Sequence, residues 1–321
     1  MSHPFAYLRA SSTADAAAHL AEPGAVPLGG GTDLLVAIGE EIARPNTLVD
    51  LRTIPGSRGI TSLDNAGVRI GASTRVAELA ADRVIRERFP VLAEACDFVG
   101  TPALRNMGTI GGNLCQRPRC WYFRRGVNCY KNGGSTCPAV AGENQYLAIL
   151  DGGPCYIVHP SDPAVALTAL DAEIEIVHPN GLRRVPIATF YELPAERIDH
   201  ETILQPGEFV SAVLIPAAAA GGRQRYQKLM QRAAWDFALV SIAACRRADG
   251  DVRLVLGGVA PRPWRVTSSV EEDVSSGGLD EDTIATLAER ALYDARPLSK
   301  NAYKVDLAAA LLRNAMRELA A

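Results

Sequence analysis

The crowding of cysteines into one stretch constrains what this 321-residue chain can fold into more than any other feature of its sequence. The chain has seven cysteines, and five of them fall between residues 115 and 155. A disulfide framework normally uses an even number of cysteines and belongs to a shorter secreted domain. A local cluster in a longer chain is instead typical of metal binding or redox chemistry.

The stretch that carries these cysteines, residues 114–155, shows little helical or strand periodicity. A loop of that length is uncommon inside a compact domain unless something anchors it, and a metal centre bound by four thiolates would be such an anchor. The candidate ligands are separated by 9, 8 and 18 positions: Cys120, Cys129, Cys137 and Cys155. The close pairs of zinc ribbons and bacterial ferredoxins are absent, so zinc, an iron–sulfur cluster and unligated thiols all remain open.

The other cysteines and the basic residues of this stretch have simpler interpretations. Cys115 is a fifth candidate ligand that the spacing does not exclude, whereas Cys96 in a helical pattern and Cys245 in a strand pattern are expected to be small buried hydrophobic residues. Basic residues around the cysteines could offset thiolate charge or face an acidic partner, although a solvated loop is favoured: Arg117, Arg119, Arg124, Arg125 and Lys131.

Residues 29–33, with the sequence Gly-Gly-Gly-Thr-Asp, join an expected strand to an expected helix. Such a turn leaves backbone N–H groups free at a helix N-terminus, where an anionic group can approach because glycine has no Cβ. Leu34 stands where a dinucleotide-binding G-x-G-x-x-G needs its third glycine, and the chain has no P-loop. The turn therefore indicates a phosphate site, with a tight structural turn as the alternative.

A second glycine-rich segment runs from Arg105 to Asn113 and adds hydroxyl and amide donors. It is long enough to wrap an extended ligand, so two such loops suggest a dinucleotide, with a surface loop as the alternative. Further along, Ser161 and Asp162 are expected to cap a helix, and Asp162 could also accept a hydrogen bond from a ligand hydroxyl.

The length of the chain and the order of its elements predict an α+β protein of two domains, residues 1–221 and 222–321. Residues 100–113 are expected to be irregular because glycine and turn formers dominate them. Strands are expected at 25–28, 47–51, 67–71, 155–159, 223–230, 238–247 and 251–259, with a hairpin at 173–186. Helices are expected at 12–21, 34–38, 74–81, 91–98, 162–170, 279–292 and 301–319, and 217–222 reads as a linker.

Charge and hydropathy exclude several classes of protein. The formal net charge is −3, with 33 basic and 36 acidic residues, which disfavours a nucleic-acid partner. The longest uncharged apolar run, residues 212–220, contains Pro216 and is too short to cross a bilayer, so no membrane insertion is expected. The first residues show no secretory signal, which favours the cytoplasm, although a partner's signal could carry a folded complex to the periplasm.

The combination of the two glycine turns resembles a known family, the FAD-binding subunits of the molybdenum hydroxylases, which include xanthine dehydrogenases and aldehyde oxidoreductases. Leu28-Gly-Gly-Gly-Thr-Asp-Leu34 and Gly108-Thr-Ile-Gly-Gly-Asn113 are similar to its two flavin diphosphate loops. The implied fold is a two-subdomain FAD-binding domain of the PCMH type, followed by a smaller domain of the CO dehydrogenase flavoprotein C-terminal type. The implied FAD-binding residues are Leu28, Gly29, Gly30, Gly31, Thr32, Asp33, Leu34, Thr74, Thr109, Ile110, Gly111, Gly112, Asn113, Asp162 and Lys228.

The cysteine stretch resembles the insert of a subgroup that holds an additional [4Fe–4S] cluster. Arg119-Cys120-Trp-Tyr-Phe123 and His159-Pro-Ser-Asp162 resemble the flavin subunit of periplasmic aldehyde oxidoreductases more closely than the β subunit of 4-hydroxybenzoyl-CoA reductase, which is the alternative. By this resemblance Cys120, Cys129, Cys137 and Cys155 are the cluster ligands and Cys115 is not.

The resemblance implies an electron-transfer subunit of a heterotrimer with no catalytic side chain of its own. A large subunit with a molybdenum cofactor would oxidise the substrate, a small [2Fe–2S] subunit would relay electrons, and this subunit would pass them through FAD to an external acceptor. Two other hypotheses are a self-sufficient flavin oxidase and a zinc-stapled interaction protein without flavin.

Overall fold

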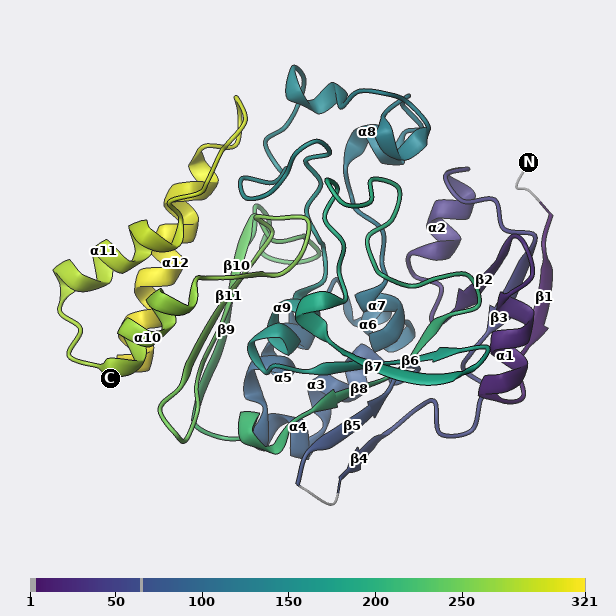
Figure 1. Cartoon of the computed structure of the whole chain (residues 1–321), viewed down its shortest axis with the longest axis horizontal. Coiled ribbons are helices and arrows are strands. Elements are labelled where there is room, and N and C mark those ends of the chain that lie inside the picture. Colours follow the sequence, from purple (N-terminus) through teal and green to yellow (C-terminus); the bar gives the residue numbers. More distant parts are fainter. Residues whose placement is uncertain (1–3, 64–65, 321) are drawn as a thin grey trace.

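Three β-sheets organise the chain, for which a computed structural model describes residues 4–63 and 66–320 (Figure 1). The first sheet is parallel in the order β1-β3-β2, and comprises β1 (Ala6–Arg9), β2 (Ala25–Leu28) and β3 (Thr47–Asp50). Its helix α1 (Thr13–Leu20) begins as predicted at Ser12, whose Oγ accepts a hydrogen bond from the Asp15 backbone N–H at 3.1 Å. Helix α2 (Leu34–Gly39) follows the first glycine turn.

The second sheet is antiparallel, with five strands in the order β4-β5-β8-β6-β7. Its strands are β4 (Ile60–Ser62), β5 (Val68–Gly71), β6 (Glu173–His178), β7 (Gly181–Pro186) and β8 (Phe209–Ile215). The predicted hairpin is confirmed, because β6 and β7 pair across the Asn180-Gly181 turn. All seven residues of the central strand β8 are buried, so this apolar run belongs to the core of the sheet.

Helices cover the second sheet and separate it from the third (Figure 1). They are α3 (Val76–Ala81), α4 (Arg83–Arg88), α5 (Pro90–Asp97), α6 (Pro102–Met107), α7 (Ile110–Leu114) and α9 (Asp162–Ala169). Every residue of α9 is buried, because α5 packs on one side of it and strands of the third sheet on another. Short 3-10 turns lie at Ile187–Thr189 and Ala217–Ala219.

The third sheet is antiparallel in the order β12-β11-β10-β9 and belongs to the C-terminal part of the chain. It comprises β9 (Arg223–Leu229), β10 (Val240–Arg246), β11 (Val252–Gly257) and β12 (Trp264–Arg265), covered by α10 (Ser268–Ser276), α11 (Glu281–Ala291) and α12 (Tyr303–Ala320). Successive side chains of β10 alternate between two cores: Ala243 joins the core with α5 and α9, whereas Ile242 and Ala244 join the core with α10–α12. Cys96 in α5 and Cys245 in β10 are buried as predicted.

Two of the sequence predictions are wrong. Residues 100–113 form helices α6 and α7 because Thr101 and Thr109 cap them with their hydroxyl oxygens and Pro102 occupies the first turn of α6. Residues 155–159 form no strand, since their only backbone contacts with neighbouring segments are isolated bonds, such as His159 N–H to the Ala260 carbonyl at 3.0 Å.

The insert has little regular structure, as its sequence predicts. It contains α8 (Trp121–Arg124) and two 3-10 turns at Tyr130–Asn132 and Pro138–Val140. It lies at one end of the molecule above both domains (Figure 1).

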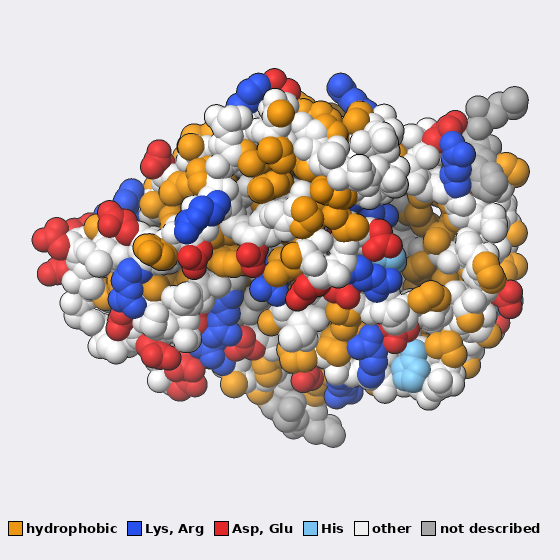
Figure 2. All heavy atoms as spheres, turned by 45° about the horizontal axis from the view of Figure 1, so that its top comes forward, with side chains coloured by type: hydrophobic (Ala, Val, Ile, Leu, Met, Phe, Trp, Pro, Cys, Tyr) orange, Lys and Arg blue, Asp and Glu red, His pale blue; other side chains and the backbone are white. Residues whose placement is uncertain are grey.

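Over the face of the molecule shown in Figure 2, acidic and basic side chains are interspersed. Within the described residues, no helix is long and apolar enough to cross a membrane.

Candidate functional site

Two cavities lie where the two domains and the insert meet. The first, here called the turn cavity, has a volume of about 400 Å³ and is lined by both glycine turns. The second, the interdomain cavity, has a volume of about 370 Å³ and is lined by the insert, by residues 158–162 and by the C-terminal domain. Arg119 and Phe237 line both cavities, and the Arg119 guanidinium lies 5.2 Å from the centre of the Phe237 ring. The cavities are therefore neighbours separated by one cation–π contact.

The first glycine turn presents unused backbone donors to the turn cavity. None of the backbone N–H groups of residues 29–33 donates a hydrogen bond to another part of the described chain. Gly31 has a φ of +74°, which only glycine adopts without strain. Because backbone N–H groups in proteins are nearly always satisfied, five consecutive free donors at a cavity wall are suited to an anionic ligand.

The second glycine turn packs directly against the first. A Cβ on Gly30 would lie 1.9 Å from the Met107 carbonyl oxygen, and a Cβ on Gly29 would lie 2.5 Å from Thr109 Oγ1. N–H groups of the second turn already bind an earlier segment of the chain: Ile110 N–H binds the Thr74 carbonyl and Gly111 N–H binds the Ala72 carbonyl, each at 2.9 Å. The glycines at this crossing are therefore needed for the close approach of two backbones.

Most of the predicted FAD-binding residues line one of the cavities. Those in the turn cavity are Gly29, Gly30, Gly31, Thr32, Asp33, Leu34, Thr109, Gly111, Gly112 and Asn113, and Asp162 lines the interdomain cavity. Leu28 and Ile110 are buried beside the turns and line neither cavity. Thr74 is also outside both, because its hydroxyl exchanges hydrogen bonds with the Gly59 backbone at 2.9 and 3.1 Å.

The Asp33 carboxylate joins the first glycine turn to the insert. It accepts hydrogen bonds from the Arg117 backbone N–H at 2.7 Å, from the Arg124 guanidinium at 2.7 Å and from the Arg119 guanidinium. Burial raises the pKa of Asp33, but Arg119 and Arg124 lower it more, so the pKa lies below its usual value. The Asp33 side chain is thus engaged with the insert rather than free for a ligand.

The expectation of a solvated basic loop is wrong for most of the insert's basic residues. Arg117 and Lys131 both pair with Glu201, at 2.7 and 2.6 Å, and the Lys131 side chain is only 1% exposed. Arg119 and Arg124 pair with Asp33. These partners are 70 or more residues away in the chain, so a local pattern could not reveal them.

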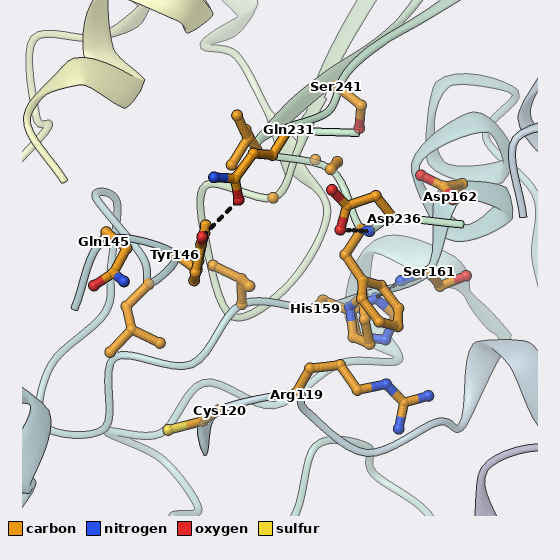
Figure 3. A pocket seen from close by; sticks show the side chains of 18 of the residues that line it. Arg119, Cys120, Gln145, Tyr146, His159, Ser161, Asp162, Gln231, Asp236 and Ser241 are labelled. Carbon is orange, nitrogen blue, oxygen red and sulfur yellow. Dashed lines mark hydrogen bonds between the residues drawn. The ribbon is translucent and has the colours of Figure 1, made fainter. Parts of the chain in front are cut away.

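A chain of side-chain hydrogen bonds links the second turn to the C-terminal domain. Asn113 Oδ1 accepts from Ser161 Oγ at 2.5 Å, and Ser161 Oγ in turn caps helix α9 by accepting from the Ala164 N–H at 3.0 Å. The next residue, Asp162, accepts from Tyr226 Oη at 2.7 Å and from Lys228 Nζ at 2.8 Å. Figure 3 shows Ser161 and Asp162 side by side at one end of the interdomain cavity.

Burial controls the electrostatics at this end of the cavity. It raises the pKa of Asp162, and the adjacent Lys228 ammonium and Tyr226 hydroxyl oppose that rise only in part. Lys228 donates to Asp162 and, at 3.2 Å, to the Phe98 carbonyl, so it lies behind Asp162 and lines neither cavity. Burial lowers the pKa of His159 to about 4, so its ring is neutral and its Nε2 donates to the Leu114 carbonyl at 3.3 Å.

The four cysteines singled out from the sequence lie around one small pocket in the insert, together with Lys131 and Leu147. Among residues 4–63 and 66–320, however, no three His, Cys, Asp or Glu side chains are arranged to hold a metal ion. Burial raises the pKa of the Cys155 thiol to about 12, which Lys131 opposes, so a metal would have to displace a firmly held proton. Cys115 lies elsewhere, in the wall of the turn cavity.

The cysteine pocket and the interdomain cavity share a wall. Cys120, Tyr122 and Leu147 line both. In Figure 3, Cys120 and Arg119 lie below the interdomain cavity, opposite Gln231, which follows β9, and Ser241 of β10. Sequence reasoning did not find the wall residue Leu147 or the dividing residue Phe237, because neither belongs to a recognisable motif, and it assigned no role to Tyr122 although the quoted stretch 119–123 contains it.

Known proteins resemble the whole chain. Residues 3–218 match the FAD binding domain in molybdopterin dehydrogenase, and residues 225–319 match the CO dehydrogenase flavoprotein C-terminal domain. The aldehyde oxidoreductase FAD-binding subunit PaoB of Escherichia coli is 37% identical over 324 residues, which cover 98% of each chain. The carbon monoxide dehydrogenase medium chain of Hydrogenophaga pseudoflava is 29% identical over 81% of this chain and 77% of its own.

Solved structures show the same fold. A chain of the carbon monoxide dehydrogenase from Hydrogenophaga pseudoflava superposes with a TM-score of 0.76 at 25% identity and covers 100% of both chains. A chain of quinoline 2-oxidoreductase from Pseudomonas putida superposes with a TM-score of 0.77 over 100% of this chain and 98% of its own. The expected fold is confirmed, and the chain belongs to the FAD-binding flavoprotein subunits of the molybdenum hydroxylase family of oxidoreductases.

Proposed function

We propose that this chain is the FAD- and [4Fe–4S]-containing electron-transfer subunit of a molybdenum-dependent aldehyde oxidoreductase. In this proposal a large molybdenum-cofactor subunit oxidises an aldehyde, a small [2Fe–2S] subunit relays the electrons, and this subunit delivers them to an external acceptor. The pairing of a free-donor glycine turn with an adjacent interdomain cavity carries the proposal. The 37% identity to an aldehyde oxidoreductase subunit supports the substrate class.

The described residues fit an extended dinucleotide. The free N–H groups of residues 29–33 would hold the diphosphate in the turn cavity. The isoalloxazine would occupy the interdomain cavity, where Asp162 could accept a hydrogen bond from a ligand hydroxyl and Phe237 supplies an aromatic wall. A bound flavin supplies storage for two electrons that can be filled one at a time, and the protein supplies position and electrostatics.

For the cluster, Cys120, Cys129, Cys137 and Cys155 are the proposed ligands. Four thiols around one pocket match the ligand set of a [4Fe–4S] centre in number and type, and Lys131 places one buried positive charge beside them. Because the thiols of the described residues are not arranged as a ligand set, cluster binding would draw them together.

Cofactor analysis of the chain purified anaerobically with its partners tests both parts of the proposal. We expect one FAD and about four iron atoms per chain in addition to the iron of the small subunit. A colourless, iron-free chain would overturn the proposal, and zinc without iron or flavin would favour a zinc-stapled interaction protein. Aldehyde turnover by this chain alone would instead favour a self-sufficient flavin oxidase.

Single cysteine replacements test the ligand assignment. Cys137→Ser should lose the iron of this chain while FAD stays largely bound, because Cys137 lies outside both cavities. Cys245→Ser is the matched control, since Cys245 is buried in β10 and lines neither cavity nor the cysteine pocket. Unchanged iron in the Cys137 variant would refute the assignment.

The compartment belongs to the proposal as well. We propose the cytoplasm as the compartment of the complex, with the periplasm as the alternative if the folded complex is exported on a partner's signal. Fractionation of cells that express all subunits distinguishes the two compartments.

A further inference from the structure

Lys304, in the first turn of α12, is completely buried. A lysine is almost never fully buried unless its charge is paired. Its ammonium donates three hydrogen bonds to backbone carbonyls, those of Tyr146 at 3.2 Å, Leu147 at 3.0 Å and Gly258 at 2.5 Å. One lysine near the C-terminus therefore holds two segments that are more than a hundred residues apart in the chain.

The three carbonyls belong to residues that form the wall of the interdomain cavity. Tyr146, Leu147 and Gly258 all line that cavity, and Leu147 also lines the cysteine pocket. Figure 3 shows Tyr146 at the end of the cavity away from Asp162, where its hydroxyl donates to Gln231 at 2.7 Å. The Lys304 ammonium thus lies directly behind a wall that faces both proposed redox centres.

No carboxylate pairs with Lys304 among the described residues, so its charge is balanced only by carbonyl dipoles. Burial lowers its pKa to about 7, yet three carbonyl acceptors match the three N–H bonds of an ammonium, and a neutral amine has only two. A buried cation without a counter-ion favours any negative charge that arrives nearby.

We propose that Lys304 is a positioning residue that fixes the wall of the interdomain cavity and whose buried positive charge raises the reduction potential of the bound flavin. This inference rests on the proposed function, since it needs a flavin in that cavity. Reduction adds electrons to the ring, and a fixed ammonium behind the wall stabilises the more negative form over the oxidised one.

A neighbouring side chain separates the two roles of Lys304. Asn301 is also completely buried, and its amide donates to the Leu147 and Ala148 carbonyls at 3.1 and 3.2 Å. It therefore supports the same wall without any charge. If Lys304 acted only by holding the wall, removal of either side chain would have the same kind of effect on the flavin.

The test compares four forms of the full complex: wild type, Lys304→Met, Asn301→Ala and Arg317→Met. Arg317 is the matched control because it is an exposed cation of the same helix, paired with Glu281 at the surface and lining neither cavity. FAD content is measured by absorbance, and the midpoint potential of the flavin by equilibration with redox dyes. Lys304→Gln, which keeps amide donors and loses the charge, is measured in addition in case the methionine variant holds no flavin.

We expect both Lys304 variants to lower the midpoint potential, by on the order of tenfold in the ratio of reduced to oxidised flavin, or about 30 mV for a two-electron couple. Asn301→Ala and Arg317→Met should leave the potential unchanged, although Asn301→Ala should retain less FAD. Unchanged potentials in the Lys304 variants, or an equal drop in Asn301→Ala, would overturn the inference and leave the proposed function intact. A wild-type complex without FAD would instead refute the proposed function.

Discussion

The glycine turns and the cysteine insert border the same pair of cavities but are held in place in different ways. The turns are held by backbone hydrogen bonds and by the contact of two backbones at Gly30 and Met107. The insert has almost no regular structure; the pairs that Asp33 and Glu201 make with its basic residues hold its first half, and Lys304 and Asn301 hold residues 146–148 near its end. The turns are therefore fixed by contacts between backbones, whereas the insert depends mainly on contacts made by side chains.

This difference suggests how the two regions respond to a ligand. Free N–H groups at the turn are already in place, so an anion binds without much reorganisation. Among the described residues the cysteines surround a pocket without forming a ligand set, so the proposed cluster would have to draw the thiols together. A substitution that disturbs backbone packing should therefore affect the turns, and one that removes an ion pair should affect the insert.

The largest effect is expected for Gly30→Ala, because its Cβ would lie 1.9 Å from the Met107 carbonyl oxygen and neither backbone can give way cheaply. Such overpacking should destabilise the protein by about 3 kcal/mol or more. The two turns would separate, and FAD content should fall with stability. Thermal unfolding and flavin absorbance measure the two effects.

Gly39→Ala is the matched control for that substitution. Gly39 ends α2, and a Cβ there would meet nothing within 4 Å. The control should be neutral or stabilise the helix by about 0.5 kcal/mol. If the Gly30→Ala protein has the same stability and the same flavin absorbance as this control, the close approach of the two turns does not depend on glycine.

Asp33→Asn tests the ionic support of the insert. It leaves the Arg119 and Arg124 guanidinium groups close together without a counter-charge, although an amide oxygen still accepts one hydrogen bond. Because the Asp33 side chain is only 15% exposed, we expect a loss of about 2 to 3 kcal/mol, somewhat less than for a fully buried pair. Limited proteolysis should cut the variant first within the insert.

The exposed pair Arg44–Glu41 provides the control, and Glu41→Gln should change stability by less than about 1 kcal/mol. The pKa of Asp33 is lowered in the folded protein, so its contribution is present above the unfolded pKa and is lost as pH falls through the folded pKa. The stability difference between wild type and Asp33→Asn should therefore vanish only at strongly acidic pH. A difference that disappears already near neutral pH would exclude this ion pair as the cause.

Local sequence signals predicted much of the fold. The Ser12 cap of α1, the Asn180-Gly181 hairpin and the buried positions of Cys96 and Cys245 follow from short patterns, and the structure confirms them. Helices α6 and α7 were missed because the glycines of residues 100–113 outweighed the capping threonines. The apolar run of β8 excluded a membrane span without identifying the central strand of a sheet.

Only the part of the candidate site that the backbone of the glycine turns forms could be predicted from the sequence. The glycine turns are visible in the sequence because glycine itself is the requirement. Contacts between side chains distant in sequence are not: Asp33 meets residues 84 to 91 positions later, and Lys304 meets carbonyls of residues 146 and 147. These pairs depend on the tertiary fold, and no local pattern encodes them.

His159 links the end of the insert to its beginning, and its titration offers a third test. Its folded pKa of about 4 lies below the usual value, so the unfolded chain binds a proton first as pH falls from 6.5. Stability should therefore decrease by about 2 kcal/mol between pH 7 and pH 4.5 through this residue alone. Urea unfolding at a series of pH values should show a shallower decrease for His159→Gln.

The exposed His19 supplies the comparison, since His19→Gln removes a ring that is 43% exposed in its contact with Asp15. Its change of slope should be smaller than that of His159→Gln, because the ring is not buried. An equal change of slope in both variants would show that the buried ring does not set the acid sensitivity of the insert.

The smallest effect is expected for Tyr226→Phe, which removes one of two donors to Asp162. Asp162 lies at the end of the interdomain cavity that side-chain hydrogen bonds hold together. Loss of a buried hydrogen bond should cost about 1 kcal/mol in stability, because Lys228 still pairs with the carboxylate. The same loss removes a donor that favours the ionised carboxylate, so the pKa of Asp162 should rise further. FAD should then be released more readily at lower pH in the variant than in the wild type, as measured by flavin fluorescence.

Tyr293→Phe, at a tyrosine that is 79% exposed, is the control and should change neither the stability nor the release of FAD. A Tyr226→Phe protein that releases flavin like wild type at every pH would mean that Lys228 alone orients Asp162, and that this end of the cavity tolerates change as the glycine turns do not.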